Sequence, residues 1–201
     1  MNLPNALSAA RIVLAAFLTG LLIAPFPYAT TAAFIVFVVA AITDTMDGRL
    51  ARRNGQVTPL GMLLDPLADK VLVCAALVSF VEIHAPGAHR ALIPAWTAIV
   101  ILSREFLVTG LRALGGRNGH DIPAGTWGKH KTAWQMLFIA ASLLALAWLR
   151  DGPPAASPAQ AALWGERLTV ATRAGAAAIA VLTAVSGVVY FRRHAALLRS
   201  K

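Results

Sequence analysis

Six apolar stretches alternate with polar segments along the chain. Three are the clearest candidates for the ~20 apolar residues that an α-helix needs to cross a bilayer, whereas the other three cover only part of that length beside a charged residue. The clearest stretches are Ile12–Pro25, Thr132–Leu149 and Val170–Phe191, and the other three are Ala29–Ile42, Val71–Val81 and Ala91–Leu102. This pattern predicts an all-α integral membrane protein with six transmembrane helices.

Basic residues gather in alternate connections between these stretches. Connections two and four and the C-terminal tail are rich in Lys and Arg, whereas connections one, three and five are uncharged or balanced. Because Lys and Arg are enriched in cytoplasmic loops, we expect both termini in the cytoplasm.

Composition agrees with a single membrane domain over residues 1–201. The chain is 58% hydrophobic and its mean hydropathy is +0.66. The net charge of +9 comes from basic residues at the ends of apolar stretches, where they favour anionic lipid headgroups. We therefore expect no nucleic-acid partner.

Acidic residues are scarce, nine in all, and four of them lie close together between the second and third apolar stretches: Asp44, Asp47, Asp65 and Asp69. The first two are three residues apart and the last two are four apart, so each pair shares one face of a helix. Carboxylates gathered near a membrane repel one another unless cations neutralise them. A site made only of carboxylates suits Mg²⁺ or Mn²⁺. The alternative is a set of solvated helix ends paired with Arg49, Arg52 and Lys70.

Small residues follow the acidic faces. Gly48 lies four residues after Asp44, Ala51 lies four after Asp47, and Gly61 lies four before Asp65. Walls without bulky side chains let a flat ligand such as a nucleotide approach the backbone. Small residues in membrane helices also serve close helix packing, which is the alternative here.

Together these residues carry a family resemblance. Asp44-x-x-Asp47-Gly48-x-x-Ala51-Arg52, then eight residues, then Gly61-x-x-x-Asp65-x-x-x-Asp69 matches the signature of the CDP-alcohol phosphotransferases position for position. The resemblance implies six helices around a cavity open to the cytoplasm.

The same resemblance implies roles for these positions. Asp44, Asp47 and Asp65 would hold two divalent ions that bind the CDP diphosphate, and Asp69 would act as general base, join the metal site, or do both. The CDP-binding residues would be Gly48, Ala51, Arg52 and Gly61.

A second charged region, at about residues 104–131, suggests where the acceptor binds. Arg104 and Arg112 are eight residues apart, close to two helical turns, so both can face the cavity. With Lys129 and Lys131 they form a cation group that suits an acceptor phosphate. Positive-inside anchoring is the alternative, and for Arg117 and Lys129 it is at least as well supported.

Further stretches resemble bacterial members of this family that act on sn-glycerol 3-phosphate: "NLPNALSAARIVL", "LDPLADKVLV", "SREFLVTGLR" and "GKHKTAWQM". With the signature they span roughly residues 2–138. The resemblance implies transfer of a phosphatidyl group from CDP-diacylglycerol to sn-glycerol 3-phosphate, which gives phosphatidylglycerol phosphate and CMP. It also implies a homodimer in the bacterial plasma (inner) membrane, with the active site facing the cytoplasm.

Two alternatives remain at this point. Another acceptor, such as inositol phosphate or an amino alcohol, could use the same metal core. A divalent-cation transporter could also carry intramembrane acids, but transporters tend to place them near the midplane between inverted repeats, and no such repeat is evident in this sequence.

Overall fold

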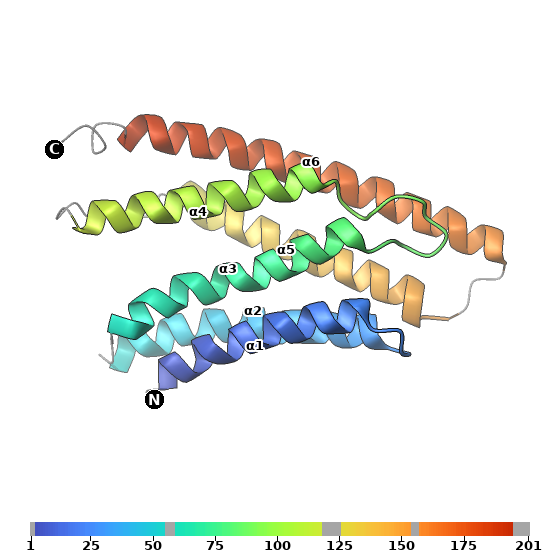
Figure 1. Ribbon diagram of the computed structural model, residues 1–201, viewed down its shortest axis with the longest axis horizontal. Coiled ribbons are helices and arrows are strands. Elements are labelled where there is room, and N and C mark those ends of the chain that lie inside the picture. Colours follow the sequence, from blue (N-terminus) through green and yellow to red (C-terminus); the bar gives the residue numbers. More distant parts are fainter. Residues whose placement is uncertain (1–2, 55–58, 118–125, 154–156, 195–201) are drawn as a thin grey trace.

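The computed structural model describes residues 3–54, 59–117, 126–153 and 157–194, with the side chains of residues 9–43, 68, 70–112, 131–153 and 157–192. Six α-helices make up most of the described chain: α1 (Leu3–Ile23), α2 (Ala29–Asn54), α3 (Pro59–Glu82), α4 (Ala95–Arg117), α5 (Thr126–Asp151) and α6 (Pro158–His194). They run alternately up and down, so that the start of α1 and the end of α6 lie at the same end of the bundle (Figure 1). We call this the terminal end and the other the opposite end.

Each predicted apolar stretch lies mainly in a helix of its own, although the helices extend beyond these stretches. α2 continues through Asp44 and Asp47 to Asn54, and α5 begins at Thr126. Pro153, Pro154 and Pro158 predict a linker between the last two apolar stretches. This prediction is wrong from residue 158 onward, because α6 begins there. The Ser157 hydroxyl accepts the backbone N–H of Gln160 at 3.2 Å, which caps the helix, and Pro158 suits its first position.

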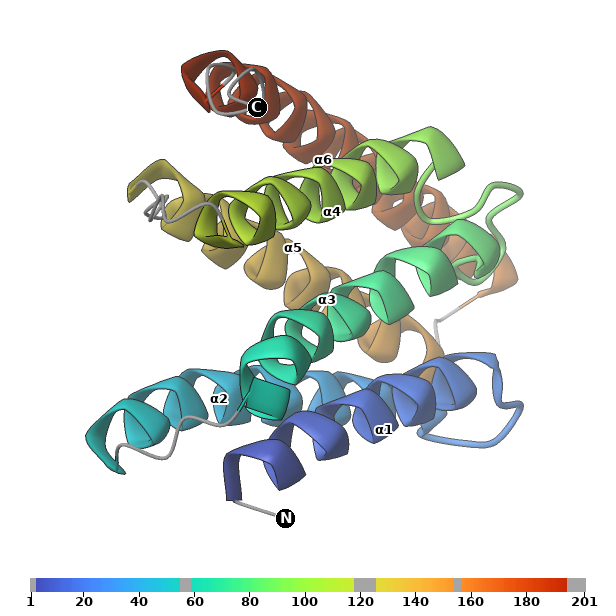
Figure 2. The same ribbon diagram turned by 60° about the vertical axis from the view of Figure 1, so that its left-hand side comes forward.

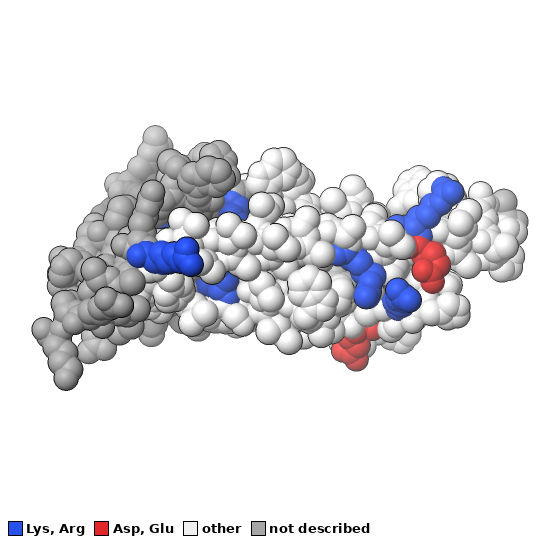
Figure 3. Space-filling model, turned by 90° about the horizontal axis from the view of Figure 1, so that it is seen from above, with Lys and Arg blue, Asp and Glu red and all other residues white. Residues whose placement is uncertain are grey.

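The surface of the bundle is largely apolar. Among the described side chains, two stretches are long and apolar enough to cross a membrane, Lys131–Asp151 and Pro158–Arg192, and two shorter apolar ones are Ala9–Ile23 and Ala29–Thr43. Large side chains such as Phe17, Ile99 and Leu182 point outward, and Figure 3 shows charged residues toward the two ends of the visible face, with a white band between them. The six helices and their apolar character are thus confirmed, whereas six spans and a cytoplasmic orientation stay predictions.

Small residues let the helices pack closely. Ala15, Ala33, Ala40 and Ala76 are completely buried, and a small side chain allows two backbones to approach. α1 packs against α2 and α3, α4 packs against α6, and α5 packs against α2 and α6. Figure 2 shows the resulting arrangement, in which α5 runs between the group α1–α3 and the pair α4 and α6.

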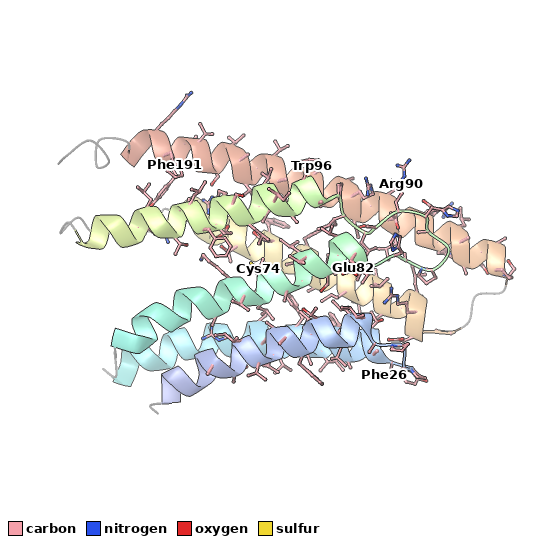
Figure 4. All side chains as sticks on the ribbon, in the orientation of Figure 1. Phe26, Cys74, Glu82, Arg90, Trp96 and Phe191 are labelled. Atoms are coloured by element: carbon pink, nitrogen blue, oxygen red, sulfur yellow. The ribbon has the colours of Figure 1, made fainter. Side chains whose placement is uncertain are left out.

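Hydrogen bonds tie the helices together at the opposite end, where Figure 4 shows Phe26, Glu82 and Arg90. The Asp151 carboxylate accepts both the backbone N–H and the hydroxyl of Thr31, at 2.7 and 2.8 Å. Arg150 donates to the backbone carbonyl of His84 at 2.8 Å. The last turn of α5 therefore joins the start of α2 to the connection after α3.

The connection between α3 and α4 lies so close to α6 that a glycine is required at the contact. A Cβ built on Gly165 would meet the carbonyl oxygen of Pro86, whereas one built on Gly20 of α1 has nothing within 4 Å. We expect Gly165→Ala to lower the free energy of unfolding by about 1–3 kcal/mol, because backbone must move to admit the methyl group. Thermal unfolding of the purified protein in detergent measures this, with Gly20→Ala as control. An unchanged midpoint for Gly165→Ala would contradict the close contact.

Candidate functional site

Four aspartates sit in two adjoining antiparallel helices at matching depths. Asp44 lies ten residues before the end of α2 and Asp69 lies ten residues after the start of α3. At 1.5 Å per residue, both are roughly 15 Å from the terminal end of their helix. Asp47 and Asp65 are likewise seven and six residues from those ends, or roughly 10 Å. The backbone therefore puts the members of the two pairs at similar levels.

The charges that follow the second apolar stretch and precede the third predict that the aspartates stand at helix ends, and the bounds of α2 and α3 show that this prediction is wrong. α2 continues for about two turns beyond Asp47, because no proline interrupts residues 48–54 and most of them favour helix. All four aspartates thus belong to helical segments of the chain. The donor set, oxygen only, fits a hard divalent cation.

The side chains of all the predicted metal- and nucleotide-binding residues lie outside the described ones. These residues are Asp44, Asp47, Asp65 and Asp69 for metal, and Gly48, Ala51, Arg52 and Gly61 for CDP. The same holds for Lys129, and their roles stay predictions. Among the side chains that the structure does describe, no group of three or more His, Cys, Asp or Glu could hold a metal ion.

A cluster of charged side chains joins α4 and α5 farther along the bundle. The ammonium group of Lys131 donates a hydrogen bond to the Glu105 carboxylate. The same carboxylate oxygen lies 3.4 Å from Nη1 of Arg104. The Lys131 side chain is only 9% exposed and that of Glu105 only 19%, so water screens this contact poorly and its geometry matters.

A small pocket lies beside this cluster and reaches α3. Its lining comes from three helices: Lys70 and Val73 of α3, Leu102 and Glu105 of α4, and Thr132 and Gln135 of α5. Lys70 directly follows Asp69 in the sequence. Glu105 lies twelve residues before the end of α4, roughly 18 Å, so the pocket is at about the depth of Asp44 and Asp69. The structure therefore brings Glu105, which contacts Lys131, close to the segment of α3 that carries Asp69.

Arg104 and Arg112 share one face of α4, as predicted, but this face lies against α6. Arg104 donates from Nη2 to the hydroxyl of Ser186 at 2.9 Å, and Arg112 donates from Nε to the hydroxyl of Tyr190 at 3.3 Å. Neither arginine is among the residues that line the pocket. Lys131 meets the pocket through its contact with Glu105.

Sequence reasoning missed several residues of this region. Gln135 is a buried polar residue in an apolar helix, and such residues in membrane helices commonly have a structural or binding role. Ser186 and Tyr190, four residues apart in an apolar helix, carry a similar signal, because that spacing puts both on one face. The position of Glu105 directly after Arg104 predicts that the two pair, which their contact confirms, whereas the sequence gives no signal for the contact of Glu105 with Lys131.

Comparison with known proteins gives a family match over nearly the whole chain. Residues 1–189 match the family described as CDP-alcohol phosphatidyltransferase.

Individual relatives are proteins named CDP-diacylglycerol–glycerol-3-phosphate 3-phosphatidyltransferase. The protein from Bacillus subtilis (strain 168) is 42% identical over 155 residues, which cover 71% of this chain and 77% of the relative. That from Pseudomonas fluorescens is 41% identical over 158 residues, 77% of this chain and 75% of the relative. That from Rickettsia bellii (strain RML369-C) is 36% identical over 145 residues, 72% of this chain and 75% of the relative.

The poorly screened contact between Glu105 and Lys131 leads to a prediction about stability. Glu105→Gln should lower the free energy of unfolding by up to about 3 kcal/mol, because it leaves the Lys131 ammonium without its carboxylate. The double variant Glu105→Gln/Lys131→Met should recover at least 1 kcal/mol of that loss, an order of magnitude typical of coupled residues. Thermal or denaturant unfolding in detergent gives the values, and Glu82→Gln, an exposed glutamate of α3, is the control. Strictly additive effects of the two substitutions would contradict the ion pair.

Proposed function

This chain belongs to the CDP-alcohol phosphatidyltransferase family, and we propose that it transfers the phosphatidyl group of CDP-diacylglycerol to sn-glycerol 3-phosphate, releasing CMP and phosphatidylglycerol phosphate. The names of relatives about 40% identical support this reaction. The structural observation that carries it is the pocket, where Lys70 next to Asp69 meets the charged cluster of α4 and α5.

The donor half of the reaction belongs to α2 and α3. Asp44, Asp47 and Asp65 would hold two Mg²⁺ or Mn²⁺ ions, with a possible share from Asp69. When bound, such ions neutralise the CDP diphosphate and the charge that passes to the leaving CMP. Gly48, Ala51 and Gly61 would let the nucleotide lie close to the helix backbone, and Arg52 would help to orient it.

The chemical step needs a base and a positioned hydroxyl. The primary hydroxyl of glycerol 3-phosphate attacks the phosphorus attached to diacylglycerol, a new P–O bond forms, and the bond to CMP breaks. The Asp69 carboxylate takes the proton of the attacking hydroxyl. No covalent intermediate with the protein is involved.

The acceptor half belongs to α4 and α5. The phosphate of glycerol 3-phosphate would be bound by four cations, Arg104, Arg112, Lys129 and Lys131. A cationic side chain that a carboxylate already orients loses little conformational freedom when it binds an anion. Glu105 supplies that carboxylate for Lys131 and Arg104. The lipid chains of the donor would stay in the bilayer around the apolar surface of the helices.

We place the site at the cytoplasmic face of a bacterial plasma membrane, because the basic connections gather at the end of the bundle toward which the aspartates lie. A homodimer is expected from the family resemblance. Within the family, an acceptor such as inositol phosphate or an amino alcohol is the second candidate. A divalent-cation transporter has no support from the relatives, whose names describe a transferase.

The first test is the reaction itself. Purified protein with CDP-diacylglycerol, Mg²⁺ and glycerol 3-phosphate should release CMP and form a new phospholipid, and a chelator should abolish both. Asp69→Asn should lower the turnover about 10²–10⁴-fold, the usual contribution of a general base. Glu82→Gln at the other end of α3 is the control and should keep full activity. Product formation with inositol phosphate but not glycerol 3-phosphate would transfer the proposal to the second candidate.

The role of Asp69 can be separated in the same assay. If it is a base, the activity of Asp69→Asn should stay low at any Mg²⁺ concentration, while the metal dependence is unchanged. If it is chiefly a ligand, excess Mg²⁺ should restore part of the activity. The equivalent change Asp44→Asn should show a shifted metal dependence in either case.

The cation group leads to a prediction about the acceptor alone. Lys131→Met and Arg112→Gln should each raise the KM for glycerol 3-phosphate about 10–100-fold, because a hydrogen bond from a charged group is lost. The KM for CDP-diacylglycerol should stay within about twofold. Equal increases of both KM values would contradict the assignment of these residues to the acceptor.

A further inference from the structure

The last helix carries a narrow polar stripe on the half that leads to the terminal end. Thr183, Ser186, Gly187 and Tyr190 follow the spacing 0, 3, 4 and 7, which puts them on one face of α6. The residues around them that face outward are large and apolar: Val181, Leu182, Val185, Val188 and Val189. The stripe therefore turns toward the inside of the bundle, where α6 packs against α4.

The contacts of this stripe are with two arginines that the proposed function uses. The Ser186 hydroxyl accepts from Arg104 at 2.9 Å. The Tyr190 hydroxyl accepts from Nε of Arg112 at 3.3 Å, and the guanidinium carbon of Arg112 lies 5.8 Å from the centre of the Tyr190 ring, within cation–π range.

Gly187 lies between these two residues and faces the stem of Arg104. A Cβ built on Gly187 would lie 3.0 Å from Cγ of Arg104. A larger residue at this position would push the arginine stem away from α6. Two hydrogen bonds, a ring contact and a glycine thus all act on the same pair of side chains.

We propose that Ser186, Gly187 and Tyr190 are positioning residues for the acceptor site, because they hold Arg104 and Arg112 in place before the acceptor phosphate arrives. This inference rests on the proposed function. A free arginine side chain has many rotamers, and fixing them in advance reduces what binding must order. The contact with Tyr190 engages Nε of Arg112, and a guanidinium group has five N–H donors, so the same side chain can hold α6 and bind a phosphate.

The kinetic test compares the two substrates in α6 variants. Ser186→Ala and Tyr190→Phe should each raise the KM for glycerol 3-phosphate about three- to tenfold, less than the loss of an arginine, because the charged group remains and loses only one hydrogen bond that positions it. Ser186→Thr, which keeps the hydroxyl, should stay closer to the parent, and Gly187→Ala should shift the same KM upward. The KM for CDP-diacylglycerol should not change. Val185→Ala and Val189→Ala, on the outward face, are the matched controls.

A second readout does not depend on activity. Phenylglyoxal modifies arginine side chains, and mass spectrometry locates the modified residues. Tyr190→Phe should speed the modification of Arg112, and Ser186→Ala that of Arg104, because each side chain loses a partner.

The possible failures are distinguishable. Unchanged modification rates together with an unchanged acceptor KM would overturn the positioning role, as would equal increases of both KM values. A third outcome is that the variants are modified faster than the parent protein, while the parent forms no product from glycerol 3-phosphate. That result would show that the α6 contacts exist. In that case the proposed function falls, and the acceptor role of these contacts falls with it.

Discussion

A charge among apolar helices is stable only where a second charge, a backbone carbonyl or water compensates it, and the polar contacts of this bundle follow from that constraint. Arg150 donates to carbonyl groups at the opposite end. Glu105 sits among cations of α4 and α5. Arg104 and Arg112 reach hydroxyl groups of α6. Apart from the contact of Arg104 with Glu105 inside α4, each of these contacts joins a helix to another helix or to the connection after α3, so the residues that are expensive to bury also fix the relative positions of the helices.

The same constraint gives the two ends of the bundle different polar residues, and this difference suits the proposed reaction. At the opposite end, Asp151 and Arg150 bond to backbone groups and connect three parts of the chain. Toward the terminal end, α2 and α3 carry four aspartates at matching depths, and the pocket by Lys70 lies at a similar level. The hydrogen bonds at the opposite end fix the positions of the helices, and a reactive site needs such support to hold its groups in place. In the proposed reaction, the helix segments that carry the metal-binding aspartates would lie near the pocket that α3, α4 and α5 line.

Much of the fold was predictable because a bilayer protein shows its helices as apolar stretches. The signature from Asp44 to Asp69 also gave the family, which the match over residues 1–189 confirms. The ends of the helices were not predictable: the charges after Ile42 suggested the end of a span, although the residues that follow continue the helix to Asn54. Pro158 was taken for a loop residue, because proline both breaks helices and begins them. The contacts of Glu105 with Lys131 and of Ser186 with Arg104 join residues 26 and 82 positions apart. Only packing brings such pairs together.

The most direct test of the account follows one oxygen atom. Glycerol 3-phosphate that carries a heavy oxygen isotope in its primary hydroxyl would be given to the purified protein with CDP-diacylglycerol and Mg²⁺, and the products would be weighed by mass spectrometry. Attack on the phosphorus attached to diacylglycerol predicts the label in phosphatidylglycerol phosphate and none in CMP. Label in a phosphodiester of CMP with glycerol 3-phosphate, with phosphatidic acid released, would mean attack on the phosphorus attached to cytidine and would contradict the proposed reaction.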